Sequence, residues 1–159
     1  MCDFPDWLPQ MVPVNPWTQG TFDMLYKIFE ADFKNKPLRY KSYTVWFFPE
    51  ILEGKELIFW HLTHREDKET KQYYPDLRRS ERLPWARPLI EHPDDRDVLS
   101  WDFKEHDGKV VTYVWLRLHD YLVLMKKYKD GQRRLMTSYY IDHEHKRKSL
   151  EKKYRGRIC

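Results

Sequence analysis

The chain has 159 residues, 41% of them hydrophobic and 34% charged, and carries a net charge of +4. That length is typical of one domain, and the aromatic content of 16% is enough for a packed core, which excludes a disordered chain. No apolar run is long enough to span a membrane, and the N-terminal residues show no signal-peptide pattern. The two cysteines lie at opposite ends, which argues against a disulfide scaffold and favours the cytoplasm.

The positive charge is concentrated in two segments. Residues 143–157 hold seven Lys or Arg against two Glu, and residues 78–87 hold four Arg against one Glu. The rest of the chain is mildly acidic. Basic patches on an acidic body fit a polyanionic partner, and RNA fits them best. The simpler interpretation is that the basic tail is only a solvated helix face.

The N-terminal third begins with a proline-rich arm over residues 1–17, which we expect to lie extended over the body because proline prevents a regular helix. An apolar stripe then predicts a helix from Thr18 or Thr21 that ends at Lys36-Pro37. Residues 38–48 and 56–63 alternate or are apolar and predict two strands, which we expect to form a hairpin.

In the middle of the chain, residues 65–76 are polar and predict a loop, and residues 77–91 predict two short helices with a kink at Pro84. Residues 98–104, 110–118, 121–127 and 133–141 predict a four-stranded antiparallel meander, with Asp107-Gly108 and Asp130-Gly131 as tight turns. Asp142 is the expected N-cap of a basic terminal helix over residues 143–154.

The pattern as a whole predicts one α+β domain. Its parts are the arm (1–17), an N-terminal helix and strand (18–54), and a core (55–155) with a central arginine-rich helix, the meander and the basic helix.

His61 is the first candidate for chemistry, because an imidazole titrates near neutral pH and serves as a general acid or base. A zinc pair with His64 is disfavoured, since a strand sends residues three apart to opposite faces and no third ligand stands out. We therefore predict neither a metal nor a cofactor. The simpler interpretation is a hydrogen-bonded histidine at a strand end.

The arginine segment is the second candidate, because the planar guanidinium binds phosphate through two parallel hydrogen bonds. Its simpler interpretation is an exposed charge network of Arg78, Glu81 and Arg82. The last strand is the third candidate: alternation places Thr137 and Tyr139 on one face, and Met136, Ser138 and Tyr140 on the other. Such tyrosines stack on bases or donate to phosphates, but they are also common at core edges.

These blocks occur in a recognisable order: a WH-x-T segment, then ERLPWARPLIE at residues 81–91, then TSYYI and a Lys/Arg helix. The chain resembles the prokaryotic and phage-associated branch of the barnase/EndoU/colicin/RelE-like ribonuclease superfamily over residues 55–155. The resemblance implies a metal-independent endoribonuclease toxin that cleaves host RNA through attack of the 2′-hydroxyl. It also implies an antitoxin or immunity protein as a partner; the oligomeric state stays open.

Carried onto this sequence, the resemblance makes His61 the acid or base, with Glu81 either a base or only a partner of Arg82. It places Arg82 on the phosphate with Arg65 or Arg79 beside it. Thr137 then contacts the scissile phosphate, and Tyr139 or Tyr140 orients a base. The predicted RNA-binding residues are Arg78, Arg87, Tyr139, Lys146, Arg147 and Lys153.

Two other functions remain open from the sequence. A non-catalytic RNA-binding module would bind RNA in a salt-sensitive way and release no product. A protein-interaction domain would dock a partner through the aromatic residues of the arm.

Overall fold

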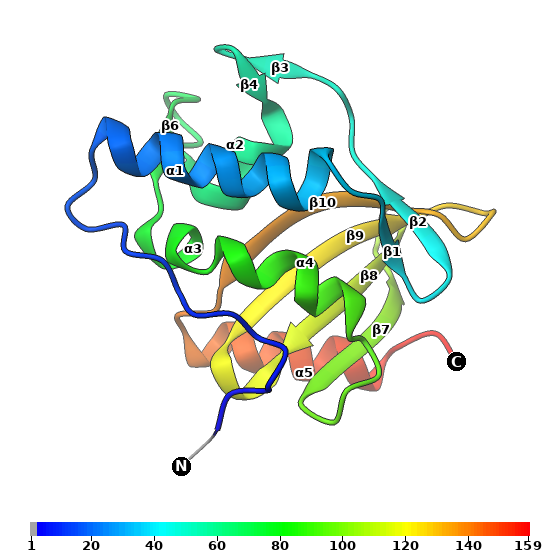
Figure 1. The fold of residues 1–159 in the computed structure, drawn as a ribbon. Coiled ribbons are helices and arrows are strands. Elements are labelled where there is room, and N and C mark those ends of the chain that lie inside the picture. Colours follow the sequence, from blue (N-terminus) through cyan, green and yellow to red (C-terminus); the bar gives the residue numbers. More distant parts are fainter. Residues whose placement is uncertain (1–2) are drawn as a thin grey trace.

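The computed structural model describes residues 3–159 and is a mixed α+β fold, which confirms the predicted class (Figure 1). Its centre is a curled, mostly antiparallel sheet of six strands in the order β1-β2-β10-β9-β8-β7. The strands are β1 (Leu38–Tyr40), β2 (Tyr43–Trp46), β7 (Val98–Lys104), β8 (Val110–Leu116), β9 (Tyr121–Lys127) and β10 (Arg133–Tyr140). Within residues 3–159, β2 and β10 are the only strands of this sheet that pair in parallel.

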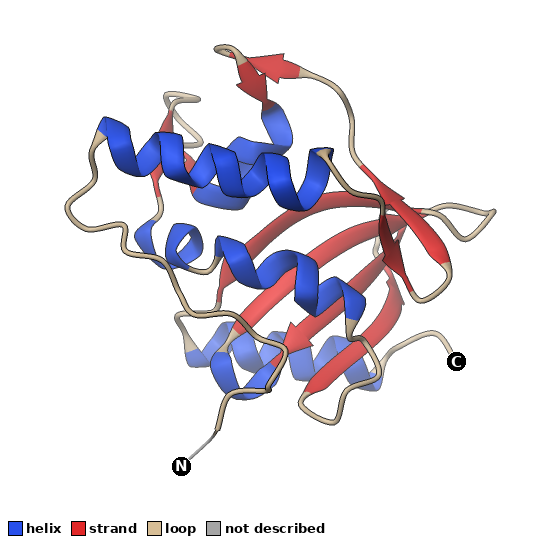
Figure 2. Ribbon diagram, in the orientation of Figure 1, coloured by secondary structure: helices blue, strands red, loops and turns tan. Residues whose placement is uncertain are grey.

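Helices cover both faces of this sheet (Figure 2). One face carries α1 (Gln19–Phe29), α2 (Leu57–Thr63) and α4 (Leu83–Glu91), and α5 (Glu144–Arg155) lies on the other. The short α3 (Leu77–Glu81) precedes α4 and packs beside β10. No helix of residues 3–159 is long and apolar enough to cross a membrane.

The proline-rich arm lies along α3 and α4, as its composition predicts. The Val12 N–H donates to the Glu81 carbonyl at 3.0 Å, and the Trp85 indole donates to the Pro9 carbonyl at 2.8 Å. Helix α1 then begins at a capping box on Thr18 and continues as one wide turn, Glu30–Lys34, up to the predicted end before Pro37.

Two strand predictions were wrong. Residues 38–48 form the tight hairpin β1–β2 instead of one strand, because Lys41 adopts a positive φ of 55°. Residues 57–63 form α2, not a strand, so the predicted hairpin with residues 38–48 does not exist; only β3 (Ile51–Leu52) and β4 (Lys55–Glu56) pair there. A short apolar run does not by itself distinguish a strand from a helix that is buried on several sides, and α2 is buried between α1 and β10.

Two further predictions need correction. The supposed loop at 65–76 contains the hairpin β5 (His64–Glu66) and β6 (Tyr73–Pro75), whose turn is held by backbone N–H groups donating to the Asp67 carboxylate. The N-cap of α5 is His143 and not Asp142, since the Asp142 carboxylate binds Lys146 at 3.1 Å. The expected break near Pro84 is present, and the residue that separates α3 from α4 is Arg82.

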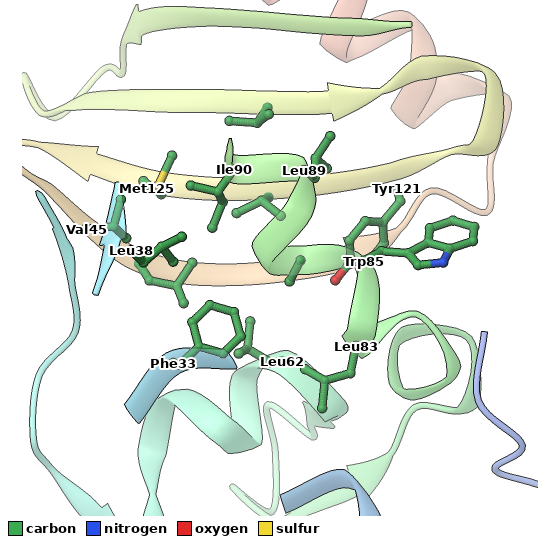
Figure 3. Packing of buried hydrophobic residues seen from close by; sticks show 14 of the residues in the cluster. Phe33, Leu38, Val45, Leu62, Leu83, Trp85, Leu89, Ile90, Tyr121 and Met125 are labelled. Carbon is green, nitrogen blue, oxygen red and sulfur yellow. The ribbon is translucent and has the colours of Figure 1, made fainter. Parts of the chain in front are cut away.

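The main core lies between the sheet and the helices α1, α2 and α4. Figure 3 shows side chains of α4, among them Leu89 and Ile90, directed at Tyr121 and Met125 of β9. A second, smaller cluster lies under α5 and includes Trp101, Trp115 and Leu150. Strand β10 packs against both clusters, with Leu135 in the first and Met136 against the second. It carries Thr137 and Tyr139 on the α5 face, where they pair with Leu124 and Leu122.

Candidate functional site

A pocket of about 470 Å³ opens on the α5 face, where β5, α3, β10 and α5 meet. We call it the Arg79 pocket. Half of the predicted site residues line it: Arg65, Arg79, Tyr139, Tyr140, Lys146 and Lys153. Cations and tyrosines that are far apart in the sequence thus gather in one hollow, which is chemically suited to an anionic, aromatic ligand.

Arg79 occupies the inner wall of this pocket. The side chain of Asp76 accepts the Arg79 N–H as the cap of α3, which fixes the start of that helix. The guanidinium donates to the His61 carbonyl at 2.8 Å, its Nε lies 3.5 Å from the Asp76 carboxylate, and its centre is 5.8 Å from the Tyr139 ring. Burial lowers the pKa of this guanidinium, opposed by Asp76, so the arrangement holds a charge that water solvates poorly.

Thr137 meets Arg79 at the same acceptor. Its hydroxyl donates to the His61 carbonyl at 3.1 Å, so α2, α3 and β10 converge on one oxygen atom. Both donors are half-buried. The strand carries a β-bulge between Leu135 and Thr137, and Met136 therefore packs against the α5-side cluster, contrary to the predicted alternation.

The imidazole of His61 lines a second hollow of about 240 Å³, with Phe48, Glu50, Arg134 and Met136 among its neighbours. We call it the His61 pocket. Tyr73 packs edge-on against the imidazole, with ring centres 5.9 Å apart. Burial, and then the nearby Arg79, lowers the pKa of His61, so the neutral ring is favoured at neutral pH. The carbonyl of His61 thus accepts from Arg79 and Thr137, while its ring lies in the separate His61 pocket.

Arg82 is placed differently from the rest of the predicted constellation. It is buried, donates to the Arg78 carbonyl at 2.9 Å and pairs with Glu81 at 2.7 Å. Its guanidinium stacks 4.3 Å from the Tyr140 ring, and the exposed Arg78 lies 5.4 Å from the same ring. Arg82 therefore packs against the Tyr140 ring, which lines the Arg79 pocket, and Glu81 is the ion-pair partner of Arg82.

Two residues predicted to bind RNA hold the fold together instead of lining the pocket. Arg87 donates to the carbonyls of Asp32 at 2.6 Å and Pro37 at 2.6 Å, which ties α4 to the end of the first helix. Arg147 forms an ion pair with Asp120. Arg65, by contrast, is exposed at the pocket and forms no ion pair within residues 3–159.

A charged triad at the other wall was missed from the sequence. Lys153 lies 3.1 Å from both oxygens of Glu105 and 2.8 Å from the hydroxyl of Tyr113, which itself donates to Glu105. Burial, and then the hydrogen bond to Glu105, raises the pKa of Tyr113, so its proton is retained. Glu105 precedes a hairpin turn and gives no sequence signal, since only tertiary packing brings α5 to it.

No group of three or more His, Cys, Asp or Glu side chains within residues 3–159 is arranged to hold a metal ion. Comparison with known protein families, with curated proteins and with solved structures finds no match to this chain. The function is therefore inferred from the residues of the site.

Proposed function

We propose that the protein is a metal-independent endoribonuclease, a toxin that acts on host RNA in the cytoplasm. The observation that supports this best is the convergence of Arg79 and Thr137 on the His61 carbonyl, beside a pocket lined by cations and tyrosines. An antitoxin or immunity protein that covers the Arg79 pocket is part of the same proposal.

The proposed chemistry is attack of a ribose 2′-hydroxyl on its own phosphodiester. The 2′-oxygen bonds to phosphorus and the bond to the 5′-oxygen breaks. The departing 5′-oxygen takes a proton from water, which gives a 2′,3′-cyclic phosphate and a 5′-hydroxyl. His61 accepts the 2′ proton, which suits a ring whose lowered pKa keeps it neutral at neutral pH. Arg79 and Thr137 donate to the non-bridging oxygens as charge develops on them, with Arg65 at the mouth of the pocket. Tyr139 provides a ring on which a base stacks.

The test is cleavage of single-stranded RNA by the purified protein in EDTA, with the product ends identified. We expect 2′,3′-cyclic phosphate ends. We expect Arg79→Lys, which keeps the charge and loses the fork, to lower kcat by about 10²-fold or more, as loss of a transition-state donor does. His61→Gln should lower kcat by about 10²- to 10⁴-fold, as loss of a general base does.

Matched controls are Arg39→Lys and His106→Gln, because both parent side chains are exposed and lie outside the two pockets. They should cleave like the wild type. The proposal is wrong if no RNA is cleaved with or without EDTA, or if Arg79→Lys and His61→Gln retain full activity in a folded protein.

One observation favours a non-catalytic RNA-binding module as the second candidate. The His61 ring lines its own hollow and not the Arg79 pocket, so the proposed base lies apart from the cations that would hold the phosphate. Such a module would hold RNA without product, and its affinity would fall steeply with salt in both wild type and His61→Gln.

A further inference from the structure

A row of aromatic and basic side chains crosses three strands beyond the His61 pocket. Arg134 of β10 pairs with Trp46 of β2 on one side and with Lys126 of β9 on the other. Phe48 and Tyr128 flank this row, with ring centres 5.5 Å and 5.4 Å from Trp46. We call these five residues the Trp46 platform.

The platform combines one exposed ring, Phe48, and two half-buried rings, Trp46 and Tyr128, with cations. Phe48 is 49% exposed, and the Arg134 guanidinium lies 4.3 Å from its ring centre. Lys126 lies 4.8 Å from the centre of the Tyr128 ring, whose hydroxyl accepts from Arg134 at 3.1 Å. A merely structural aromatic cluster would bury the Phe48 ring as well.

The charges of the platform are available to a ligand. Neither Lys126 nor Arg134 forms an ion pair with any carboxylate of residues 3–159. Their sequence neighbours Lys127 and Arg133 both pair with Asp102, at 3.1 Å and 3.6 Å. The strand alternation thus places the neutralised cations on one face of the sheet and the unneutralised ones on the other.

The platform is continuous with the candidate site. Lys126 lies on the same face of β9 as Leu124 and Leu122, which pair with Thr137 and Tyr139. Phe48 and Arg134 also line the His61 pocket. From Arg134 to Tyr139 the strand advances about 15 Å at the usual rise per residue, a span of a few nucleotides of extended chain.

We propose that the Trp46 platform binds single-stranded RNA, stacking unpaired bases on its rings and holding the backbone with Arg134 and Lys126. Stacking needs a free base face, which a duplex does not offer, so the ligand is single-stranded. The inference rests on the proposed function for the identity of the ligand and adds a binding surface outside the Arg79 pocket.

The experiment measures binding of a dye-labelled, 2′-O-methylated single-stranded oligouridylate by anisotropy, in EDTA and at several salt concentrations. The modified ribose has no free 2′-hydroxyl, so binding is measured without cleavage. Phe48→Ala should weaken binding about fivefold or more, as loss of a stacking ring does. Arg134→Ala should reduce the slope of log K against log salt by about 0.7, one phosphate contact on a single strand.

The controls are Leu118→Ala, which removes an apolar side chain of similar exposure (54%), and Arg96→Ala, which removes an exposed arginine elsewhere. Both should bind like the wild type, and circular dichroism should show that all four variants fold. Binding by Phe48→Ala and Arg134→Ala at wild-type strength, or wild-type preference for an RNA duplex, would overturn the proposal and leave the platform to a protein partner. If Phe48→Ala and Arg134→Ala bind more weakly but the wild type cleaves no RNA, the platform is supported and the nuclease proposal is refuted. Failure of the platform and failure of the nuclease are therefore distinguishable.

Discussion

Individual side chains in this protein owe their properties to burial more than to their intrinsic chemistry. His64 shows this most clearly: it is 4% exposed, lies against Trp60 and Trp17, and its Nδ1 is 2.7 Å from the Thr63 hydroxyl. Burial, followed by the Arg79 charge, lowers the pKa of His64 to about 4. The WH-x-T-H segment thus contains two histidines of different kinds, one half-buried beside a hollow and one enclosed in the core.

His64 predicts a pH dependence of stability. Its folded pKa of about 4 lies below the ordinary value of 6.5, so between these pH values the unfolded chain binds more protons. The free energy of unfolding therefore falls as the pH drops from 6.5 toward 4, by on the order of 3 kcal/mol for this group, and is unaffected by it above that window. Urea unfolding at pH 7.5, 5.5 and 4.5 measures the change.

The matched comparison uses His64→Gln, which should flatten this part of the profile, and His106→Gln, an exposed histidine, which should leave it unchanged. Equal pH profiles for wild type and His64→Gln would show that His64 titrates normally in the folded protein.

At the scale of elements, the hairpin turns decide where β10 begins and which residues face each pocket. The Asp-Gly turns predicted from the sequence are present, with φ of 88° at Gly108 and 92° at Gly131. They differ in their surroundings: a Cβ on Gly108 would meet nothing, whereas a Cβ on Gly131 would overlap the Tyr43 ring of β2. The second turn therefore also packs against the β1–β2 hairpin, through the Tyr43 ring.

This difference predicts unequal effects of the same substitution. Gly108→Ala should lower the free energy of unfolding by about 1–2 kcal/mol, the cost of a side chain at positive φ. Gly131→Ala adds a steric clash and should cost about 1–3 kcal/mol more. Chemical denaturation of both variants tests this, and equal losses would mean that the Tyr43 ring moves aside at little cost.

The elements are predictable to different degrees, for reasons that the residues show. The strands of the meander alternate and end at Asp-Gly turns, so the sequence predicts each of them close to its true bounds. Residues 57–63 resemble a strand because nearly every side chain there is apolar, and only contact with α1 and β10 selects the helix. The β-bulge at Met136 has no local signal, yet it decides that Arg134 and Thr137 share a face.

At the scale of the whole molecule, the two faces of the sheet differ in how far they are covered and in the charges beside them. The proline-rich arm, α1 and α4 cover one face, and the other leaves the Arg79 pocket and the Trp46 platform open beside α5. The exposed side of α5 carries Lys148, Lys152 and Arg155, none of which is ion-paired within the described chain. These cations are placed to raise the potential around the pocket without lining it.

We therefore expect replacement of Lys148, Lys152 and Arg155 by Gln to weaken RNA binding and to lower its salt slope, by up to about 0.7 for each phosphate interaction that is removed. If the protein is a nuclease, kcat at saturating RNA should change little, because these groups touch no reacting atom. Binding titrations at several salt concentrations measure the effect. Replacement of the exposed Lys27, Lys36 and Lys41, which lie on other elements, is the control, and an equal weakening there would indicate net charge alone.

The sequence by itself determined the α+β class, the four strands of the meander with their glycine turns, and the two basic segments, because these depend on local periodicity and composition. It also singled out Arg79, Thr137 and Tyr139 as candidates. Only the tertiary structure decided where these side chains lie and what they contact. In the folded chain Arg82 pairs with Glu81 and Arg87 donates to the main chain of Asp32. Glu105 pairs with Lys153. Arg79 and Thr137 both donate to the His61 carbonyl. Such placements depend on contacts between residues distant in the chain, which no local pattern encodes.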